Sequence, residues 1–390
     1  MFRMADKRPE KDIIKYEKEV TELETKFGVF VRSGLFEVLF MLVAVWAVFY
    51  VSGRMGEMLR AFLGVDLTVV IFTVLAVLML YMLLYIKSEK VKKASRKWYE
   101  GCCVVVCFLL YLTIGLIMFE AVRWMLGIHD ARMFLVPVVA SFFVTLYGFT
   151  HAKDLKLKTY DIHIQNAQKK KIVLLSDIHA GTFVNKDQLH KIVEMVNAQD
   201  PDIVLIAGDM FDVGAFYVCD RPAFVPELQN MHAKDGVYAI LGNHDPAHNE
   251  KLIYDFYEQC GIKLLVDETC SVDGFLIVGR DDSMTDANRC ELAHLTCERN
   301  NRPVIVMDHN PTGIAEAIRE GVDLIVCGHT HKGQFFPADI FTRLAYGKKD
   351  YYGMYHRSEK TVSVVTSGVG YFGMPMRIGS DSEVVVLNIK

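Results

Sequence analysis

Five short polar segments in the second half of the chain carry side chains that can bind a metal or transfer a proton. They are SDIHAG, AGDMFD, LGNHD, MDHNP and CGHTH, and together they supply Asp177, His179, Asp209, Asp212, Asn243, His244, His309, His329 and His331. Mixed nitrogen and oxygen donors of this kind suit borderline divalent metals such as Mn, Fe, Zn or Co. Two such metals can share a bridging carboxylate and activate a water molecule between them. The number of donors is sufficient for two metal sites with one shared ligand.

Each polar segment ends a hydrophobic run that we expect to form a buried strand. The runs are KKIVLLSD, DIVLIAGD, GVYAILGN, PVIVMDHN and DLIVCGHT, and the intervening stretches NKDQLHKIVEMVNAQ, KLIYDFYEQC, ANRCELAHLTCERN and GIAEAIREG are typical of helices. This alternation predicts an α/β domain. In such sheets the ligand site forms at the carboxyl ends of the strands. All five polar segments lie at that end, so we expect their side chains to meet.

In this order, the five segments resemble the signature blocks of the calcineurin-like metallophosphoesterase family: DxH, GDxxD, GNHD, an isolated His and GHTH. The resemblance covers about residues 160–390 and implies an αββα sandwich that hydrolyses phosphoesters with two divalent metals. The ligands it implies are Asp177, His179 and His331 for one metal, Asn243, His309 and His329 for the other, and Asp209 for both. Hydroxide activated by the metals would then attack phosphorus in line.

Two further side chains have catalytic roles in this resemblance. His244 would act as general acid toward the leaving oxygen, or would donate a hydrogen bond to the substrate phosphate. Asp212, the second aspartate of GDxxD, would orient His244. Asn243 would contact the substrate as well as a metal.

Within this family, the sequence resembles a membrane-anchored, mostly bacterial branch more closely than the family as a whole. In that branch the last block usually continues as GHTHGGQ. Here residues 328–334 read GHTHKGQ, and a glycine-rich tail, SGVGYFGMPMR, ends at Arg377. Lys332, which replaces a glycine of the branch, either binds a substrate phosphate or points to solvent. A lysine adopts a positive φ poorly, so the resemblance does not determine the backbone conformation at residue 332. Arg377 either reaches the phosphate or holds the C-terminal strands together.

The first half of the chain carries long apolar stretches, which fits the high hydrophobic content of the whole protein, 52%. The stretches are residues 34–53, 67–86, 101–119 and 133–150. A helix needs roughly 20 residues to cross a hydrocarbon core about 30 Å thick, so we expect four transmembrane spans. The fourth is the shortest and contains Pro137. Ionisable residues approach the spans at their ends, at Glu37 and Glu120, which favours an anchor over a transport pathway.

Lysine and arginine are abundant before the first span, between the second and third spans and after the fourth, and scarce in the other two connections. The positive-inside rule then predicts a multi-pass protein of the cell membrane. Its N-terminal segment, residues 1–33, and its catalytic domain, residues 151–390, would both be cytoplasmic, joined by a transmembrane domain at 34–150. An apolar helix face in residues 1–33 either lies on the membrane surface or forms a coiled coil. The nine cysteines, without a CxxC pair, are expected to be reduced.

We therefore expect a membrane-anchored phosphoesterase that cleaves a phosphodiester, pyrophosphate or phosphomonoester bond, with membrane lipids around its anchor. The resemblance implies a lipid-linked or nucleotide substrate. An aromatic loop at residues 333–360 either forms a pocket for an acyl chain or a base, or packs on its own domain. The alternatives are a non-catalytic scaffold or sensor, which would have lost ligand residues, and a transporter with an attached domain. A formal charge of -4 argues against a nucleic-acid partner, and the oligomeric state stays open.

Overall fold

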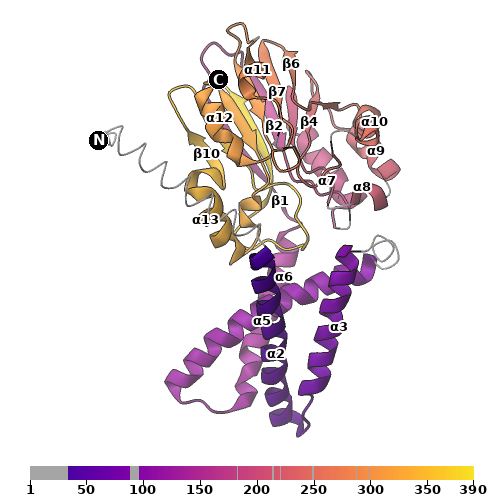
Figure 1. Cartoon of the computed structure of the whole chain (residues 1–390), viewed down its shortest axis with the longest axis vertical. Helices are drawn as coiled ribbons and strands as arrows, with labels where there is room; N and C mark the ends of the chain where they lie inside the picture. Colours follow the sequence, from indigo (N-terminus) through magenta and orange to yellow (C-terminus); the bar gives the residue numbers. More distant parts are fainter. Residues whose placement is uncertain are drawn as a thin grey trace, which may run out of the picture.

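The computed structural model of the chain describes residues 34–87, 96–181, 183–212, 215–219, 221–247, 250–286, 288–297 and 299–390. The amphipathic segment predicted at residues 1–33 lies outside the described residues, as does the side chain of Glu37. Figure 1 shows a layered α/β domain with a group of long helices at one end of it.

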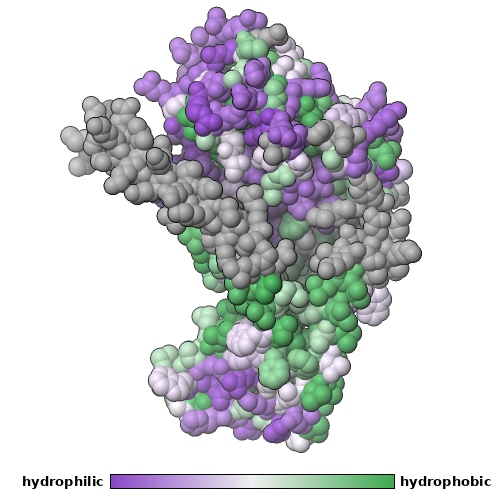
Figure 2. All heavy atoms as spheres, in the orientation of Figure 1, coloured by the Kyte–Doolittle hydropathy of each residue, from purple (hydrophilic) through white to green (hydrophobic). Residues whose placement is uncertain are grey.

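Four helices in the described part of the chain are long and apolar enough to cross a membrane. They are α2 (Gly34–Leu63), α3 (Thr68–Lys87), α5 (Arg96–Leu126) and α6 (Leu135–His151), with the 3-10 turn η1 (Ala131–Phe134) before α6. Helix α2 runs beyond the predicted apolar stretch into a polar turn, where Arg54 and Glu57 pair with each other. Pro137 lies in the first turn of α6, where a missing backbone N–H breaks no helical hydrogen bond. Figure 2 shows hydrophobic residues over the part of these helices next to a largely hydrophilic domain, and hydrophilic residues at their far end.

Glu120, the ionisable residue expected at the end of the third span, is paired with residues of a neighbouring helix. Tyr50 Oη donates to Glu120 Oε2 at 2.7 Å, and Arg54 Nε lies 2.5 Å from Glu120 Oε1. These contacts join α2 to α5, so they support the packing of the helices.

The α/β domain contains two six-stranded sheets within the described residues. The first sheet has the order β1 (Leu155–Ile162), β12 (Ser382–Ile389), β2 (Lys170–Leu175), β3 (Ile203–Ala207), β4 (Val237–Ile240), β5 (Lys263–Leu264). The second has the order β10 (Gly353–His356), β11 (Val362–Val365), β9 (Leu324–Cys327), β8 (Val304–Met307), β7 (Phe275–Gly279), β6 (Glu268–Val272). β2, β3, β4 and β5 are mutually parallel, as are β7, β8, β9 and β11. The carboxyl ends of the motif-bearing strands therefore lie at one end of each sheet.

The two sheets pack face to face through buried aliphatic side chains such as Leu174, Leu205, Ile277 and Ile305. Helices α7 (Lys186–Asn197), α8 (Ala215–Val218), α9 (Arg221–Gln229) and α10 (Lys251–Gln259) cover the outer face of the first sheet. Helices α11 (Leu292–Thr296) and α12 (Ile314–Arg319) cover the outer face of the second. The layers are helix, sheet, sheet, helix, which confirms the predicted αββα sandwich.

The predicted loop at residues 333–360 is largely regular structure. It contains helix α13 (Ala338–Asp350) and strand β10. The short turns η2 (Pro311–Gly313) and η3 (His331–Gly333) precede this helix along the chain. The expectation of a loop was wrong: Ile340 and Leu344 are four residues apart, as on one face of a helix, and the helix that they form has no buried residue. A kink at Gly347, where φ is 75°, ends the regular part of the helix.

The α/β domain is bonded directly to the long apolar helices. Tyr111 Oη of α5 donates to the carbonyl of Phe336 at 2.6 Å, and the Arg377 amide donates to the carbonyl of Gly148 in α6 at 3.0 Å. An added Cβ at Gly148 would lie 2.6 Å from Met376 Cγ, so only glycine lets the C-terminal tail approach the helix this closely. The tail and the start of α13 thus rest on α5 and α6.

Candidate metal centre and active site

Five strands deliver the predicted donor residues to one end of the sandwich. Asp177 follows β2, Asp209 follows β3, Asn243 follows β4, His309 follows β8 and His329 follows β9. In the register of the first sheet Leu175 pairs with Ile206 and Ala207 with Ile240, so these strands end at the same level. The side chains meet because parallel strands align their carboxyl ends.

The first donor set contains Asp177, His179, His331 and Asp209. His179 Nε2 lies 3.1 Å from His331 Nε2, and Asp177 Oδ1 lies 3.3 Å from His331 Nε2. Asp209 Oδ2 lies 3.6 Å from His179 Nε2. Atoms that each stand about 2.0–2.2 Å from one ion are separated from one another by roughly 3–4 Å. These spacings fit donors that converge on a single cation.

The second donor set contains Asn243, His309, His329 and the same aspartate. Asp209 Oδ2 lies 3.2 Å from His309 Nε2, and Asn243 Oδ1 lies 2.7 Å from His329 Nδ1. His309 Nδ1 is 2.8 Å from the carbonyl of Ala207, an acceptor, so Nδ1 carries the proton and Nε2 presents its lone pair. That buried Nε2 has no hydrogen-bond partner among the described residues. A lone pair of this kind, aimed at a carboxylate, fits a metal ligand.

Several donor residues have backbone angles that few L-amino acids adopt. The angle φ is 54° at Asp177, 49° at His179, 52° at Asp209, 68° at His329 and 48° at His331. A residue in this region costs roughly 1–2 kcal/mol, although aspartate and histidine tolerate it better than most. The sharp turn directs each side chain back across the end of its strand, and strain of this sort is found at functional sites.

Two motif glycines make room for the carboxylates. A Cβ at Gly242 would lie 2.2 Å from Asp209 Oδ1, and a Cβ at Gly328 would lie 2.3 Å from Asp177 Oδ2. The neighbouring amides use this space: the His244 amide donates to Asp209 Oδ1 at 2.9 Å, and the His329 amide donates to Asp177 Oδ1 at 3.1 Å. The glycines of GNHD and GHTH therefore set the carboxylates in place.

The protonation states also suit metal binding. Burial lowers the pKa of His179 and of His329 to about 3, so both imidazoles are neutral at pH 7. Burial raises the pKa of Asp177 to about 6. Burial opposes ionisation of Asp209 as well, but the contact with His309 holds its pKa below the ordinary value. Burial opposes the charge of His309, but Asp209 raises the pKa of that histidine, so a cation bound there would take the place of the Nε2 proton. Neutral histidines and ionised aspartates are the forms that bind cations.

His244 and Asp212 lie beside the first donor set. His244 Nε2 is 4.0 Å from Asp209 Oδ2, and Asp212 Oδ1 is 4.0 Å from His179 Nδ1. Asp212, His179 and His244 present ligand atoms within 4.8 Å of one another. The His244 side chain keeps 17% exposure whereas that of His179 has none, so a substrate can reach His244.

Lys332 and Arg377, for each of which a phosphate contact was one of two expectations, make interactions within the protein. Lys332 has φ 52°, so the chain keeps the backbone shape of a glycine, and its Nζ lies 4.7 Å from the centre of the Tyr352 ring. Arg377 is fully buried, and its guanidinium donates to the carbonyls of His331, Ser367, Gly368 and Gly370. These contacts favour the alternative in which Arg377 holds the C-terminal segments together.

Sequence reasoning gave no role to Asp245, the last residue of GNHD. Its buried carboxylate accepts hydrogen bonds from the amides of Met210 at 3.2 Å, Phe211 at 3.0 Å and Gly242 at 2.9 Å. It therefore joins the segment after β3 to the segment after β4. In the sequence, Asp245 directly follows Asn243 and His244, which were expected in the site. An aspartate at that position could equally have been a metal ligand, so its adjacency did not indicate a structural role.

Gln334 and Phe372, also unassigned from the sequence, place the C-terminal tail over the histidines. Gln334 Nε2 donates to the carbonyls of Phe372 and Met374, and the Phe372 amide donates to Gln334 Oε1 at 2.8 Å. The Phe372 ring lies 4.8 Å from the ring of His244 and 5.8 Å from that of His179. An aromatic side chain that is 46% exposed therefore stands at the mouth of the site.

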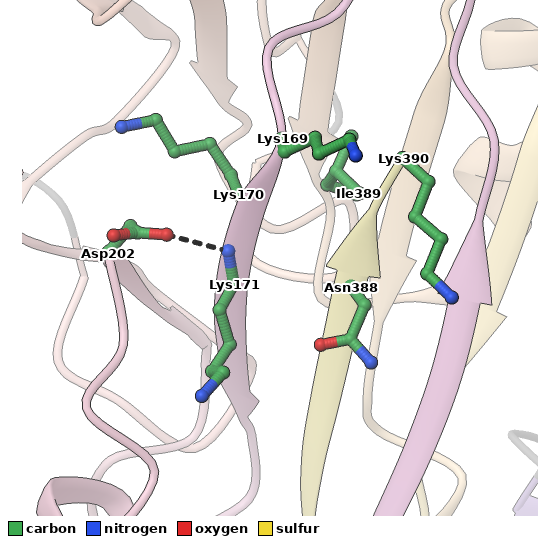
Figure 3. Close-up of a pocket in the computed structure, with 7 residues that line it drawn as sticks. All are labelled: Lys169, Lys170, Lys171, Asp202, Asn388, Ile389 and Lys390. Atoms are coloured by element: carbon green, nitrogen blue, oxygen red, sulfur yellow. Dashed lines mark hydrogen bonds between the residues drawn. The ribbon is translucent and has the colours of Figure 1, made fainter.

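A shallow pocket lined by lysines lies elsewhere in the domain, at the amino end of β2 and the carboxyl end of β12 (Figure 3). Lys170 Nζ pairs there with Asp235 and Asp273, and Lys390 Nζ pairs with Asp161. The donor residues follow the opposite end of β2, so this pocket is separate from the candidate site.

An αββα sandwich with these histidines and carboxylates at its strand ends defines the class of metal-dependent phosphoester hydrolases. The family model described as "Calcineurin-like phosphoesterase" matches residues 170–333. A metallophosphoesterase of Aquifex aeolicus is 30% identical over 261 residues, which cover 63% of this chain and 97% of that protein. The chain therefore belongs to the calcineurin-like metallophosphoesterase family.

Two further relatives bear on the helical part of the chain. One is similar over most of this chain, and the name of the other describes a transmembrane protein. A metallophosphoesterase of Campylobacter jejuni is 28% identical over 339 residues, covering 82% of this chain and 88% of that protein. A "Transmembrane protein with metallophosphoesterase domain" of Danio rerio is 31% identical over 282 residues, covering 66% of this chain and 63% of that protein.

Proposed function

We propose that this protein is a membrane-anchored phosphoesterase that cleaves a phosphodiester, pyrophosphate or phosphomonoester bond at a centre of two divalent metals. The observation that carries the proposal is the position of Asp209 Oδ2, which lies 3.6 Å from His179 Nε2 and 3.2 Å from His309 Nε2. One oxygen between two histidines from different sheets is the arrangement that a bridging ligand requires.

In this proposal the two donor sets hold one cation each. The ligands are Asp177, His179 and His331 for one, Asn243, His309 and His329 for the other, and Asp209 for both. When bound, the two cations supply Lewis acidity at the phosphoryl oxygens and lower the pKa of a water between them. The second-sphere contacts support this assignment, because Ala207 fixes the tautomer of His309 and Asp245 fixes the loops that carry the donors.

The protein's own residues then bind and orient the substrate. His244 is proposed to protonate the leaving oxygen or to donate a hydrogen bond to the phosphate, since it is the partly exposed histidine beside Asp209. Asn243 would contact the phosphate from the second donor set. Asp212 is proposed to position His244, and Arg377 to act indirectly, through the backbone of the His331 turn.

The anchor is proposed to place the domain on the cytoplasmic face of a cell membrane. The four apolar helices are even in number, and Figure 1 shows that α2 begins and α6 ends near the α/β domain. The loop charges favour the cytoplasm for that side. A scaffold or sensor that had lost catalysis would tolerate changes among the donors, yet all seven proposed ligand positions keep a metal-binding side chain.

Replacing the bridging ligand tests the metal centre. The full-length protein should hold close to two divalent metals per chain after reconstitution with Mn, Fe, Zn or Co, and should hydrolyse bis(p-nitrophenyl) phosphate. Asp209→Asn removes the charge shared by both sites, so we expect it to lower metal content and turnover together. Asp161→Asn, an exposed carboxylate paired with Lys390, serves as the control and should change neither. A wild-type protein that takes up none of the four metals would refute the proposal.

A further inference from the structure

Helix α13 turns apolar side chains away from its own domain. Phe336, just before the helix, and Ile340, Phe341 and Leu344 within it are 45%, 47%, 56% and 60% exposed. Within the helix, Ile340 and Leu344 are four positions apart and form one stripe, with Phe341 beside it and Phe336 just before the helix. No residue of α13, which is described in full, is buried. The core of the domain therefore does not account for this stripe, which we call the α13 apolar face.

This face lies at the end of the α/β domain that meets the long apolar helices, with α5 running obliquely beneath (Figure 1). Phe336 is bonded to Tyr111 of α5, and the adjoining tail is bonded to Gly148, three residues before α6 ends at His151. At 1.5 Å per residue, Gly148 lies about 5 Å inside the end of that helix, so the α13 apolar face adjoins the end of a long apolar helix.

The charges around the face are those that an anionic lipid surface attracts. Arg343, Lys348 and Lys349 of α13 are exposed. The acidic residues of the helix, Asp339 and Asp350, are only partly exposed, and Asp350 is paired with Arg357. Apolar side chains flanked by basic ones are the pattern of a helix that lies in the plane of a bilayer.

The other side of α13 touches the candidate site. The Tyr346 ring lies 5.9 Å from the ring of His329. A Cβ at Gly333 would lie 2.2 Å from Asp339 Cα, so the turn that carries His331 packs directly on the start of the helix. One helix thus contacts the donor residues on its inner side and presents apolar side chains on its outer side.

We propose that the α13 apolar face rests in the lipid interface and holds the mouth of the site at the bilayer surface, so that the substrate is an amphiphilic phosphoester whose hydrocarbon part stays in the membrane. This inference rests on the proposed hydrolytic function. The occupant of the face is lipid, because the face adjoins helices long and apolar enough to cross a membrane and carries exposed lysine and arginine. Exposed Phe372 extends the apolar surface to the edge of the site.

Two esters with the same leaving group separate this inference from the proposed function. One is the p-nitrophenyl ester of dioleoyl phosphatidic acid in vesicles with anionic lipid, and the other is methyl p-nitrophenyl phosphate in water. The variant Ile340→Ser/Phe341→Ser/Leu344→Ser should lose about tenfold or more in kcat/KM on the lipid ester, since the side chains that seat the helix are gone. It should stay within about twofold of wild type on the soluble ester. Leu157→Ser/Leu252→Ser removes exposed leucines elsewhere and should match wild type on both.

Contact with lipid is measured directly by quenching. In a background where Trp46, Trp98 and Trp124 are phenylalanine, Leu344→Trp should be quenched by brominated lipids and Leu252→Trp should not. Absence of quenching at position 344, or equal losses on both esters in the triple variant, would overturn the inference while leaving hydrolysis intact. A dimer or a protein complex that the triple variant abolishes, without quenching at 344, would assign the face to a protein instead. Failure of the wild type on both esters would count against the proposed function itself.

Discussion

At the scale of single residues, His244 differs from the other histidines of the site. It follows the proposed ligand Asn243 directly, its side chain is partly exposed, and its Nδ1 is buried without a hydrogen-bond partner among the described residues. His309, in contrast, has its Nδ1 committed to the Ala207 carbonyl and its side chain fully enclosed. His244 is therefore the histidine best placed to touch a substrate rather than a metal.

The first prediction follows from that placement. His244→Ala should leave metal content near that of wild type and lower turnover by roughly 10²–10⁴-fold, as expected for a positioned acid. The loss should be smaller for a nitrophenyl ester than for an alkyl ester, because an acidic leaving oxygen needs little protonation. Single-turnover rates on the two esters, together with elemental analysis, measure both effects. Equal losses on the two esters would mean that His244 binds the phosphate and does not protonate the leaving group.

The sequence indicated which residue types gather at the site, but not how they are held. Asp177 and His331 could be named because carboxylates and imidazoles at successive strand ends are uncommon. The left-handed angles at the same residues depend on turns that form only when the sheets assemble. Asp245 was missed for a related reason, since its three amide donors come from the turns after two different strands. Lys332 shows the limit most clearly, because it adopts a positive φ that its residue type disfavours.

At the scale of elements, the strands that lead into the site were predictable and those at the sheet edges were not. β2, β3, β4, β8 and β9 are short, wholly or largely buried hydrophobic runs, and their sequence pattern is strong. Most residues of β1 are exposed, and the strand depends on parallel pairing with β12, which lies more than 200 positions later in the chain. A pairing of that separation leaves no local signal. Helix α13 was missed because its apolar residues match no buried face of its own domain.

The contact between α6 and the C-terminal tail yields a prediction at this scale. Gly148→Leu places a side chain where Met376 and Ile378 already lie, so we expect overpacking of about 1–3 kcal/mol. Because the tail also carries Phe372 and Arg377, turnover should fall along with the thermal midpoint. Both are measured on the protein in nanodiscs.

Gly53→Leu is the matched control for that change. Gly53 lies in α2, and an added Cβ there meets nothing within 4 Å. Both substitutions replace glycine in a helix by a better helix former, worth up to about 1 kcal/mol, so only Gly148→Leu adds a clash. If the two variants behave alike, the α6 contact does not position the tail.

At the scale of the whole molecule, the orientation of the membrane region decides which pool of substrate the site can meet. The basic residues are distributed unevenly along the helical part of the chain. The second half of α2, the end of α5 and η1 have Arg54, Arg60, Arg123 and Arg132, whereas the segments before α2, between α3 and α5 and after α6 have many more lysines. The nine cysteines all lie in the described part of the chain, and none of them forms a disulfide there. Cysteines without disulfides are common in a reducing compartment, and both properties are consistent with the proposed cytoplasmic orientation.

The last prediction tests that orientation with reporters. A fluorescent protein fused after Lys390 should fluoresce, and an alkaline phosphatase fused at the same place should be inactive, because the latter folds only outside the cytoplasm. A phosphatase fused after Gly127, between α5 and η1, should be active, which shows that the reporter can be exported from this chain. The weak point is α6, the shortest of the four helices and the one with Pro137 near its start. If α6 did not cross the membrane, an odd number of spans would put the catalytic domain outside. An active phosphatase after Lys390 would therefore reverse the topology, and with it the proposal that the site faces the cytoplasm.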